Sequence, residues 1–89
     1  MATLIKINGK KENIESANGK AFTLEELQKA VNGYIQLIPI NSGKYAGKLM
    51  IIDEEGLLKS NPKLNEVASE IADRRIVGQV LIIDKTQIK

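Results

Sequence analysis

The feature that most constrains this fold is the set of turn dipeptides that divide its apolar residues into short segments. Asn-Gly occurs at residues 8–9, 18–19 and 32–33, and Asn-Pro at residues 61–62. Asparagine and glycine tolerate positive φ, and proline lacks a backbone N–H, so each dipeptide favours the end of a regular element. No apolar run approaches the roughly 20 residues of a membrane span. The pattern therefore predicts short strands and helices joined by turns.

Five to six of these segments read as strands. Residues 3–7 alternate in polarity, and residues 10–16 can return as the second strand of a hairpin across Asn8-Gly9. Pro39 cannot donate to a strand ladder, so we expect it near a strand end or on a sheet edge. The remaining predicted strands are residues 34–40 and 48–53, which form a second hairpin, a brief segment at 57–59, and residues 76–84.

Two helices are expected. The first begins at Thr23, because Thr23 and Glu26 have the spacing of a capping box, and it ends at Gly33, which suits a left-handed C′ position. For the second, Asn61 is the expected N-cap and Pro62 the first turn. Its end is expected at residues 73–75, where two arginines meet the negative end of the helix dipole.

The order of segments predicts an α+β fold, with a mostly antiparallel sheet of four to six strands and two helices packed on one face. A length of 89 residues suits one domain over residues 1–89, with 85–89 as a loose tail. The only aromatic residues are Phe22, Tyr34 and Tyr45, so the core is expected to be aliphatic. So many aliphatic residues in a short chain also favour a buried subunit interface, and we expect a homo-oligomer, either a dimer or a tetramer.

The composition argues against most enzymes. The chain contains no cysteine and no histidine, so it lacks disulfides, thiolate ligands and the commonest general base. A net charge of +2 is too small to predict DNA or RNA binding. The N-terminal segment lacks the apolar core of a signal peptide, which favours a cytoplasmic protein without a membrane partner. We expect no catalytic residue, metal or cofactor.

Cationic and aromatic residues give the first candidates for ligand binding. Lys44, Tyr45 and Lys48 lie together in and after the turn-rich loop 41–47, where a ring and two ammonium groups suit a base and a phosphate. A plain hairpin loop is the alternative. Arg74 and Arg75 can clamp a phosphate or simply solvate a helix end.

Polar and amide side chains complete the candidates. Tyr34 can stack on a base or pack at the rim of the core. Gln36, Asn61 and Asn65 carry amides that can read a base edge or a ribose, although Asn61 also suits a helix cap. The acidic residues 53–55 can be a Mg²⁺ or Ca²⁺ site, but three adjacent residues in a turn rarely converge on one ion, and a solvated turn is favoured.

Three segments carry a family resemblance: "LEELQKAVNGYIQLIPI", "KLMIIDEEGLLKSNPKLNEVA" and "IVGQVLIID". In this order they resemble a family of small phage and mobile-element proteins carried as a domain of unknown function, over residues 4–84. The chain departs from that pattern at Gln36, where an acid is common, at Asp53, where asparagine is common, and in a longer segment at 68–75.

Small proteins of this kind are similar in type to phage sponges, which sequester cyclic nucleotide signals of bacterial defence systems such as CBASS or Thoeris without cleaving them. This resemblance implies an anti-CBASS role in the cytoplasm of an infected host, with a cyclic dinucleotide such as cGAMP as ligand. The open alternatives are a sponge for a cyclic ADP-ribose-type signal and a protein-interaction module that inhibits a host defence protein. The expected ligand-binding residues are Tyr34, Gln36, Lys44, Tyr45, Lys48, Asn61, Asn65, Arg74 and Arg75.

Overall fold

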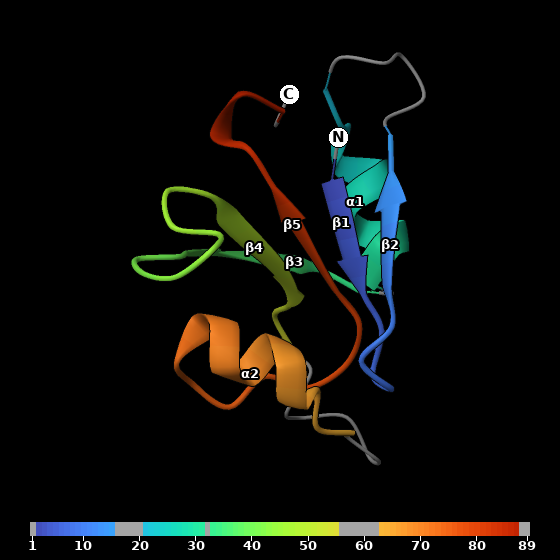
Figure 1. Cartoon of the computed structure of the whole chain (residues 1–89). Helices are drawn as coiled ribbons and strands as arrows, with labels where there is room; N and C mark the ends of the chain where they lie inside the picture. Colours follow the sequence, from blue (N-terminus) through green and yellow to red (C-terminus); the bar gives the residue numbers. More distant parts are fainter. Residues whose placement is uncertain (1, 16–20, 32, 56–62, 88–89) are drawn as a thin grey trace.

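A five-stranded antiparallel sheet forms the centre of the protein (Figure 1). The computed structural model describes residues 2–15, 21–31, 33–55 and 63–87. The strand order is β2-β1-β5-β4-β3, so β2 and β3 end the sheet among the described residues. The strands are β1 (Ala2–Ile5), β2 (Lys11–Ile14), β3 (Ile35–Pro39), β4 (Leu49–Asp53) and β5 (Val80–Ile83).

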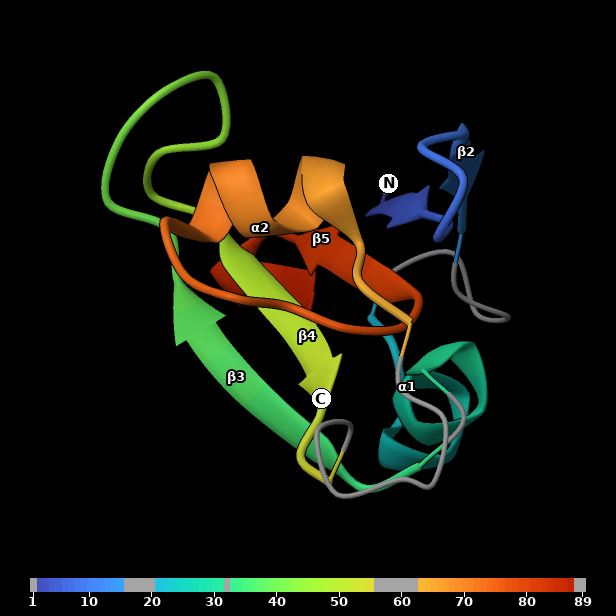
Figure 2. The same cartoon turned by 90° about the horizontal axis from the view of Figure 1, so that it is seen from below.

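Two helices cover the sheet, α1 (Leu24–Val31) and α2 (Glu66–Ala72). Leu27 and Val31 of α1 pack in one hydrophobic cluster with Leu81, whereas Ala68 of α2 packs in a second cluster with Ile82. Successive strand residues point to opposite faces, so the two clusters lie on opposite sides of the sheet. Figure 2 shows α1 and α2 on opposite sides of the sheet. The predicted α+β fold and antiparallel sheet are confirmed, but the prediction that both helices pack on one face is wrong.

The physical reason is that the central strands are apolar on both sides. All four residues of β5 are buried, as are Met50 and Ile51 of β4. A strand with no polar face needs cover on both sides, and one helix supplies it on each. As predicted, the core is aliphatic, with Phe22 the one aromatic side chain buried among the described residues. No helix in the described ranges is both long and apolar enough to cross a membrane.

Both predicted hairpins are present. β1 pairs with β2 across a turn in which Gly9 has a φ of 89° and the Asn8 side chain accepts a hydrogen bond from the Lys10 N–H (3.0 Å). β3 pairs with β4, and Pro39 lies at the end of the edge strand β3, as expected. The further strand predicted at 57–59 lies outside the described residues.

The start of α1 is the predicted capping box. The Glu26 N–H donates to Thr23 Oγ1 (3.2 Å), and the Thr23 N–H donates to Glu26 Oε1 (3.0 Å). Gly33 follows the helix but is not left-handed, contrary to the prediction. A Cβ at this position would lie 2.7 Å from Asp53 Oδ1, so glycine is needed here for close packing against a carboxylate.

The N-cap of α2 is Asn65, so the prediction that this helix starts at Asn61 and Pro62 is wrong. Asn65 Oδ1 accepts from the Ala68 N–H (3.1 Å) at the first turn. Asn61 and Pro62 themselves lie outside the described residues. The helix ends where expected, at Asp73, which is the left-handed C-cap with a φ of 55°.

The C-terminal part departs from the prediction in two places. β5 starts at Val80 instead of residue 76, because Gly78 has a φ of 79° and Val77 forms only an isolated bridge with Leu64. Residues 85–87, predicted as part of a loose tail, form the 3-10 helix η2 (Lys85–Gln87). The Gln87 carbonyl accepts from the Phe22 N–H (2.6 Å), which ties this segment to the start of α1.

Candidate functional site

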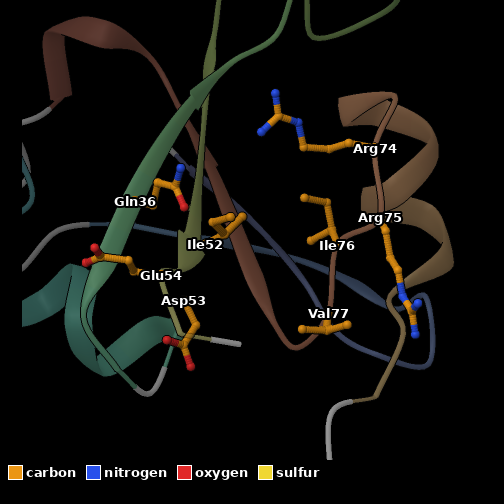
Figure 3. Close-up of a pocket in the computed structure, with 8 residues that line it drawn as sticks. All are labelled: Gln36, Ile52, Asp53, Glu54, Arg74, Arg75, Ile76 and Val77. Atoms are coloured by element: carbon orange, nitrogen blue, oxygen red, sulfur yellow. The ribbon is translucent and has the colours of Figure 1, made fainter. Parts of the chain in front are cut away.

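A cavity of about 230 Å³ lies where the end of α2 passes the β3 side of the sheet, and we call it the Arg74 cleft (Figure 3). Its floor is apolar and its walls carry amide, carboxylate and guanidinium groups. It is lined by Gln36, Ile52, Asp53, Glu54, Arg74, Arg75, Ile76 and Val77.

The fold explains why these residues meet. Gln36 of β3 and Ile52 of β4 are register partners, so their side chains share one face of the sheet. Met50, two residues from Ile52, belongs to the α2-side cluster, so this is the face that α2 covers. The left-handed C-cap at Asp73 then turns the chain so that Arg74 follows the helix directly, and the Arg74 N–H donates to the Ser69 carbonyl (3.2 Å).

The two arginines point in different directions. Figure 3 shows the Arg74 side chain extending toward β3, whereas that of Arg75 extends away from Gln36, beside Val77. Within the described ranges, the ion pairs are Lys6–Glu12 and Lys48–Asp84, so neither arginine has a carboxylate partner there. The Arg74 guanidinium is therefore available for an anionic group of a ligand.

The carboxylates of the cleft differ in their surroundings. Asp53 is only 8% exposed, and its Oδ1 accepts from the Glu55 N–H (3.0 Å) while its carboxylate packs against Gly33. This side chain holds the turn after β4. Glu54 and Glu55 are exposed, as expected for a solvated turn. Glu54, at the rim of the cleft, was not among the predicted ligand-binding residues, because its neighbours across the cleft are remote in sequence.

A second hollow, which we call the Tyr45 groove, has a volume of about 360 Å³. The ammonium groups of Lys11 and Lys44 lie 5.9 and 5.6 Å from the centre of the Tyr45 ring, in the range of cation–π contacts. Its lining combines the β3–β4 loop with α2 and the start of β2, namely Lys11, Ser42, Gly43, Lys44, Tyr45, Val67, Glu70 and Ile71. Lys11 and Glu70 were not foreseen, since only the fold brings them to this loop.

The remaining candidates lie elsewhere. Lys48 Nζ is 3.7 Å from Asp84 Oδ1, in a half-exposed ion pair. Tyr34 is 65% exposed at the start of β3. Asn65 is fully buried, and all its side-chain bonds are made within the protein. Asn61 lies outside the described residues.

The structure thus brings some of the predicted binding residues together in two separate hollows. Gln36, Arg74 and Arg75 line the Arg74 cleft, and Lys44 and Tyr45 line the Tyr45 groove. The described residues hold no group of three or more acidic side chains arranged to bind a metal ion. An arginine, an amide and an apolar floor can hold an anionic ligand that also has a flat, hydrogen-bonding part.

Comparison with known proteins gives a family but no activity. A family profile described as a domain of unknown function, DUF3846, matches residues 1–88. No curated protein and no solved structure matches the chain. The residues of the two hollows are therefore the basis on which a function can be inferred.

Proposed function

The chain belongs to the DUF3846 family, a domain of unknown function, and we propose that it is a phage anti-defence sponge that sequesters a cyclic dinucleotide such as cGAMP without cleaving it. The observation that carries this proposal is the Arg74 cleft. There the Arg74 guanidinium extends toward β3, which carries Gln36, over an apolar floor. This guanidinium has no ion-pair partner among the described residues. In this proposal the protein acts in the cytoplasm of the infected host.

Each part of a cyclic dinucleotide has a suitable group in the cleft. The planar guanidinium of Arg74 can donate two parallel hydrogen bonds to a phosphate. The Gln36 amide both donates and accepts, so it can pair with the edge of a base. Ile52 and Ile76 offer an apolar surface for the face of that base.

Glu54 adds a preference among bases. A carboxylate accepts hydrogen bonds and donates none when ionised. Guanine presents adjacent N–H donors on its pairing edge, whereas adenine presents a single amino group there. Glu54 at the rim of the cleft therefore favours a guanine-containing signal.

Binding without cleavage agrees with the chemistry available in the chain. Hydrolysis of a phosphodiester needs an activated nucleophile and stabilisation of the leaving oxygen. The sequence contains no histidine and no cysteine to supply the first. The arginines and the amide of the cleft bind charge and hydrogen-bonding edges but do not move protons near neutral pH. Of its two carboxylates, Asp53 already accepts from the Glu55 N–H, and Glu54 lies exposed at the rim.

The test is calorimetric titration of the protein with 3′,3′-cGAMP, cyclic di-GMP and cyclic di-AMP. We expect the guanine-containing ligands to bind, and Arg74→Gln to weaken binding at least tenfold, because it removes the only proposed phosphate fork. Lys29→Gln is the matched control, since it removes one exposed positive charge from α1 on the other face of the sheet.

Two further readouts sharpen this experiment. Tyr45→Leu should change the affinity less than twofold if the ligand occupies the Arg74 cleft, and a larger loss would place the ligand in the Tyr45 groove. Mass spectrometry of the ligand after incubation should recover it intact. Cleaved ligand, or no heat change with any of the three nucleotides, would refute the proposed function.

A further inference from the structure

Within the part of the chain that the structure describes, no strand pairs with the outer edge of β3. Tyr34 and Ile40, the residues directly before and after this strand, bond toward the β4 side: the Tyr34 carbonyl accepts from the Glu54 N–H (2.8 Å), and the Ile40 N–H donates to the Lys48 carbonyl (2.9 Å). Along an antiparallel strand, alternate residues direct their backbone groups to opposite sides. The backbone groups of Ile35, Leu37 and Pro39 therefore point outward, away from β4.

Pro39 limits what this edge can pair with. It occupies an outward position, so its missing N–H removes no bond to β4. Only Ile35 and Leu37 then offer both an outward N–H and an outward carbonyl. Leu37 is also 43% exposed, an apolar side chain beside an open strand edge. Such an edge is a template for another strand.

From these features we propose that β3 pairs antiparallel with β3 of a second copy, centred on Gln36, and that the two Arg74 clefts join into one ligand pocket. In this register Ile35 of each copy lies opposite the partner's Leu37, and the pairing satisfies all four outward groups of both residues. If the register shifts so that Ile35 lies opposite the partner's Pro39, the Ile35 carbonyl has no donor, because proline has no backbone N–H. If the register shifts the other way, Leu37 lies opposite the partner's Gly33. The Leu37 carbonyl then has no donor either, because the Gly33 N–H already donates to the Gln28 carbonyl.

The centre of this pairing is also the cleft. Gln36 would face the partner's Gln36 as a non-hydrogen-bonded pair, in which side chains lie closest. Because Gln36 lines the Arg74 cleft, the two-fold axis would bring the two clefts together on the α2 face. A single cleft of about 230 Å³ is small beside the roughly 300–1,000 Å³ typical of ligand pockets, and a second copy doubles it.

The symmetry of the proposed ligand suits this arrangement. A two-fold interface presents the same groups twice, and a cyclic dinucleotide has two phosphates and two bases related in the same way. One Arg74 would meet each phosphate. This inference rests on the proposed function for the identity of the ligand, but the pairing of β3 is tested separately.

The register is tested by single cysteines, since the chain has none of its own. Gln36→Cys should form a disulfide-linked dimer on mild oxidation, because the paired Cα atoms would lie about 4.5 Å apart. Leu37→Cys is the matched control. Its two copies would be offset by two residues, about 8 Å between Cα atoms, which is too far for a disulfide. Crosslinking of Leu37→Cys in preference to Gln36→Cys would overturn the register.

The interface is tested by light scattering and sedimentation. The wild type should be a dimer, and Leu37→Lys should raise its dissociation constant at least tenfold. Ile7→Lys is the control, because Ile7 is equally exposed (43%) but lies in the β1–β2 turn. A monomeric wild type, or a dimer unaffected by Leu37→Lys, would overturn the inference, as would an edge that pairs only with a different protein.

Ligand stoichiometry separates this inference from the function. One cyclic dinucleotide for every two chains is expected. A monomer that binds one ligand through Arg74 would refute the shared pocket but still support the proposed sponge function. If Gln36→Cys forms a disulfide-linked dimer but the wild type binds no cyclic dinucleotide, the interface is supported and the sponge function is refuted.

Discussion

Replacement of Asn65 by alanine should destabilise the protein more than replacement of any other polar residue that we consider. Asn65 is fully buried, and its Oδ1 accepts from the Ala68 N–H as the N-cap of α2. Its Nδ2 donates to the carbonyls of Ile5 (3.1 Å) and Gly78 (2.9 Å). One side chain thus joins the start of α2 to β1 and to the α2–β5 connection that carries Arg74.

The size of the effect follows from these three bonds. Loss of an N-cap costs about 0.5–2 kcal/mol. A hydrogen bond within the protein contributes about 0.5–1.5 kcal/mol net, and alanine removes two of them, to the carbonyls of Ile5 and Gly78. We expect Asn65→Ala to lower the free energy of unfolding by about 1.5–5 kcal/mol in sum, a large part of the roughly 5–15 kcal/mol of a typical domain.

Equilibrium unfolding in urea measures this loss of stability. The urea concentration at the midpoint should fall, while the dependence of the unfolding free energy on urea concentration stays unchanged. Asn65→Asp separates the two roles, because it keeps the cap acceptor but removes both Nδ2 donors and directs a carboxylate at two carbonyls. It should be at least as unstable as Asn65→Ala. Asn13→Ala, at an exposed position of β2, is the control and should change stability by less than about 0.5 kcal/mol. A loss below about 1 kcal/mol for Asn65→Ala would refute this reasoning.

Two further changes test local packing and capping. Gly33→Ala would place a Cβ 2.7 Å from Asp53 Oδ1, so it should lower the free energy of unfolding by about 1–3 kcal/mol; an unchanged urea midpoint would contradict the close packing. Thr23→Ala should cost about 1 kcal/mol through loss of the capping box at α1. The double variant with Glu26→Ala should cost little more, because the two side chains act together, and additive losses would argue against a reciprocal box.

The parts of the fold that local chemistry decides were predictable from sequence. The Asn8-Gly9 turn and the Thr23 capping box involve residues two to three positions apart, and both are present. The start of α2 was not predictable in this way. Two asparagines precede the apolar stripe of that helix, and Asn65 is the cap that also bonds to Ile5, a residue 60 positions away in the chain.

The placement of the two helices on opposite faces of the sheet was predictable from the apolar residues of the central strands. "LMII" in β4 and "VLII" in β5 are continuous apolar runs, which is typical of strands buried on both faces, whereas one-sided strands alternate. The grouping of site residues had no such signal. Gln36 meets the Arg74 segment, and Lys11 meets Tyr45, only because of the strand order and the turn after α2.

Pro39 also bears on how much of this protein a cell can hold. In the proposed role, with one ligand for every two chains, the protein has to outnumber its target molecules and therefore has to accumulate without precipitating. An open strand that could recruit copy after copy would seed fibres at such concentrations. Proline at one end of β3, and lysine and glutamate on β2 at the far side of the sheet, disfavour the addition of further strands, so we expect the proposed assembly to stop at two copies.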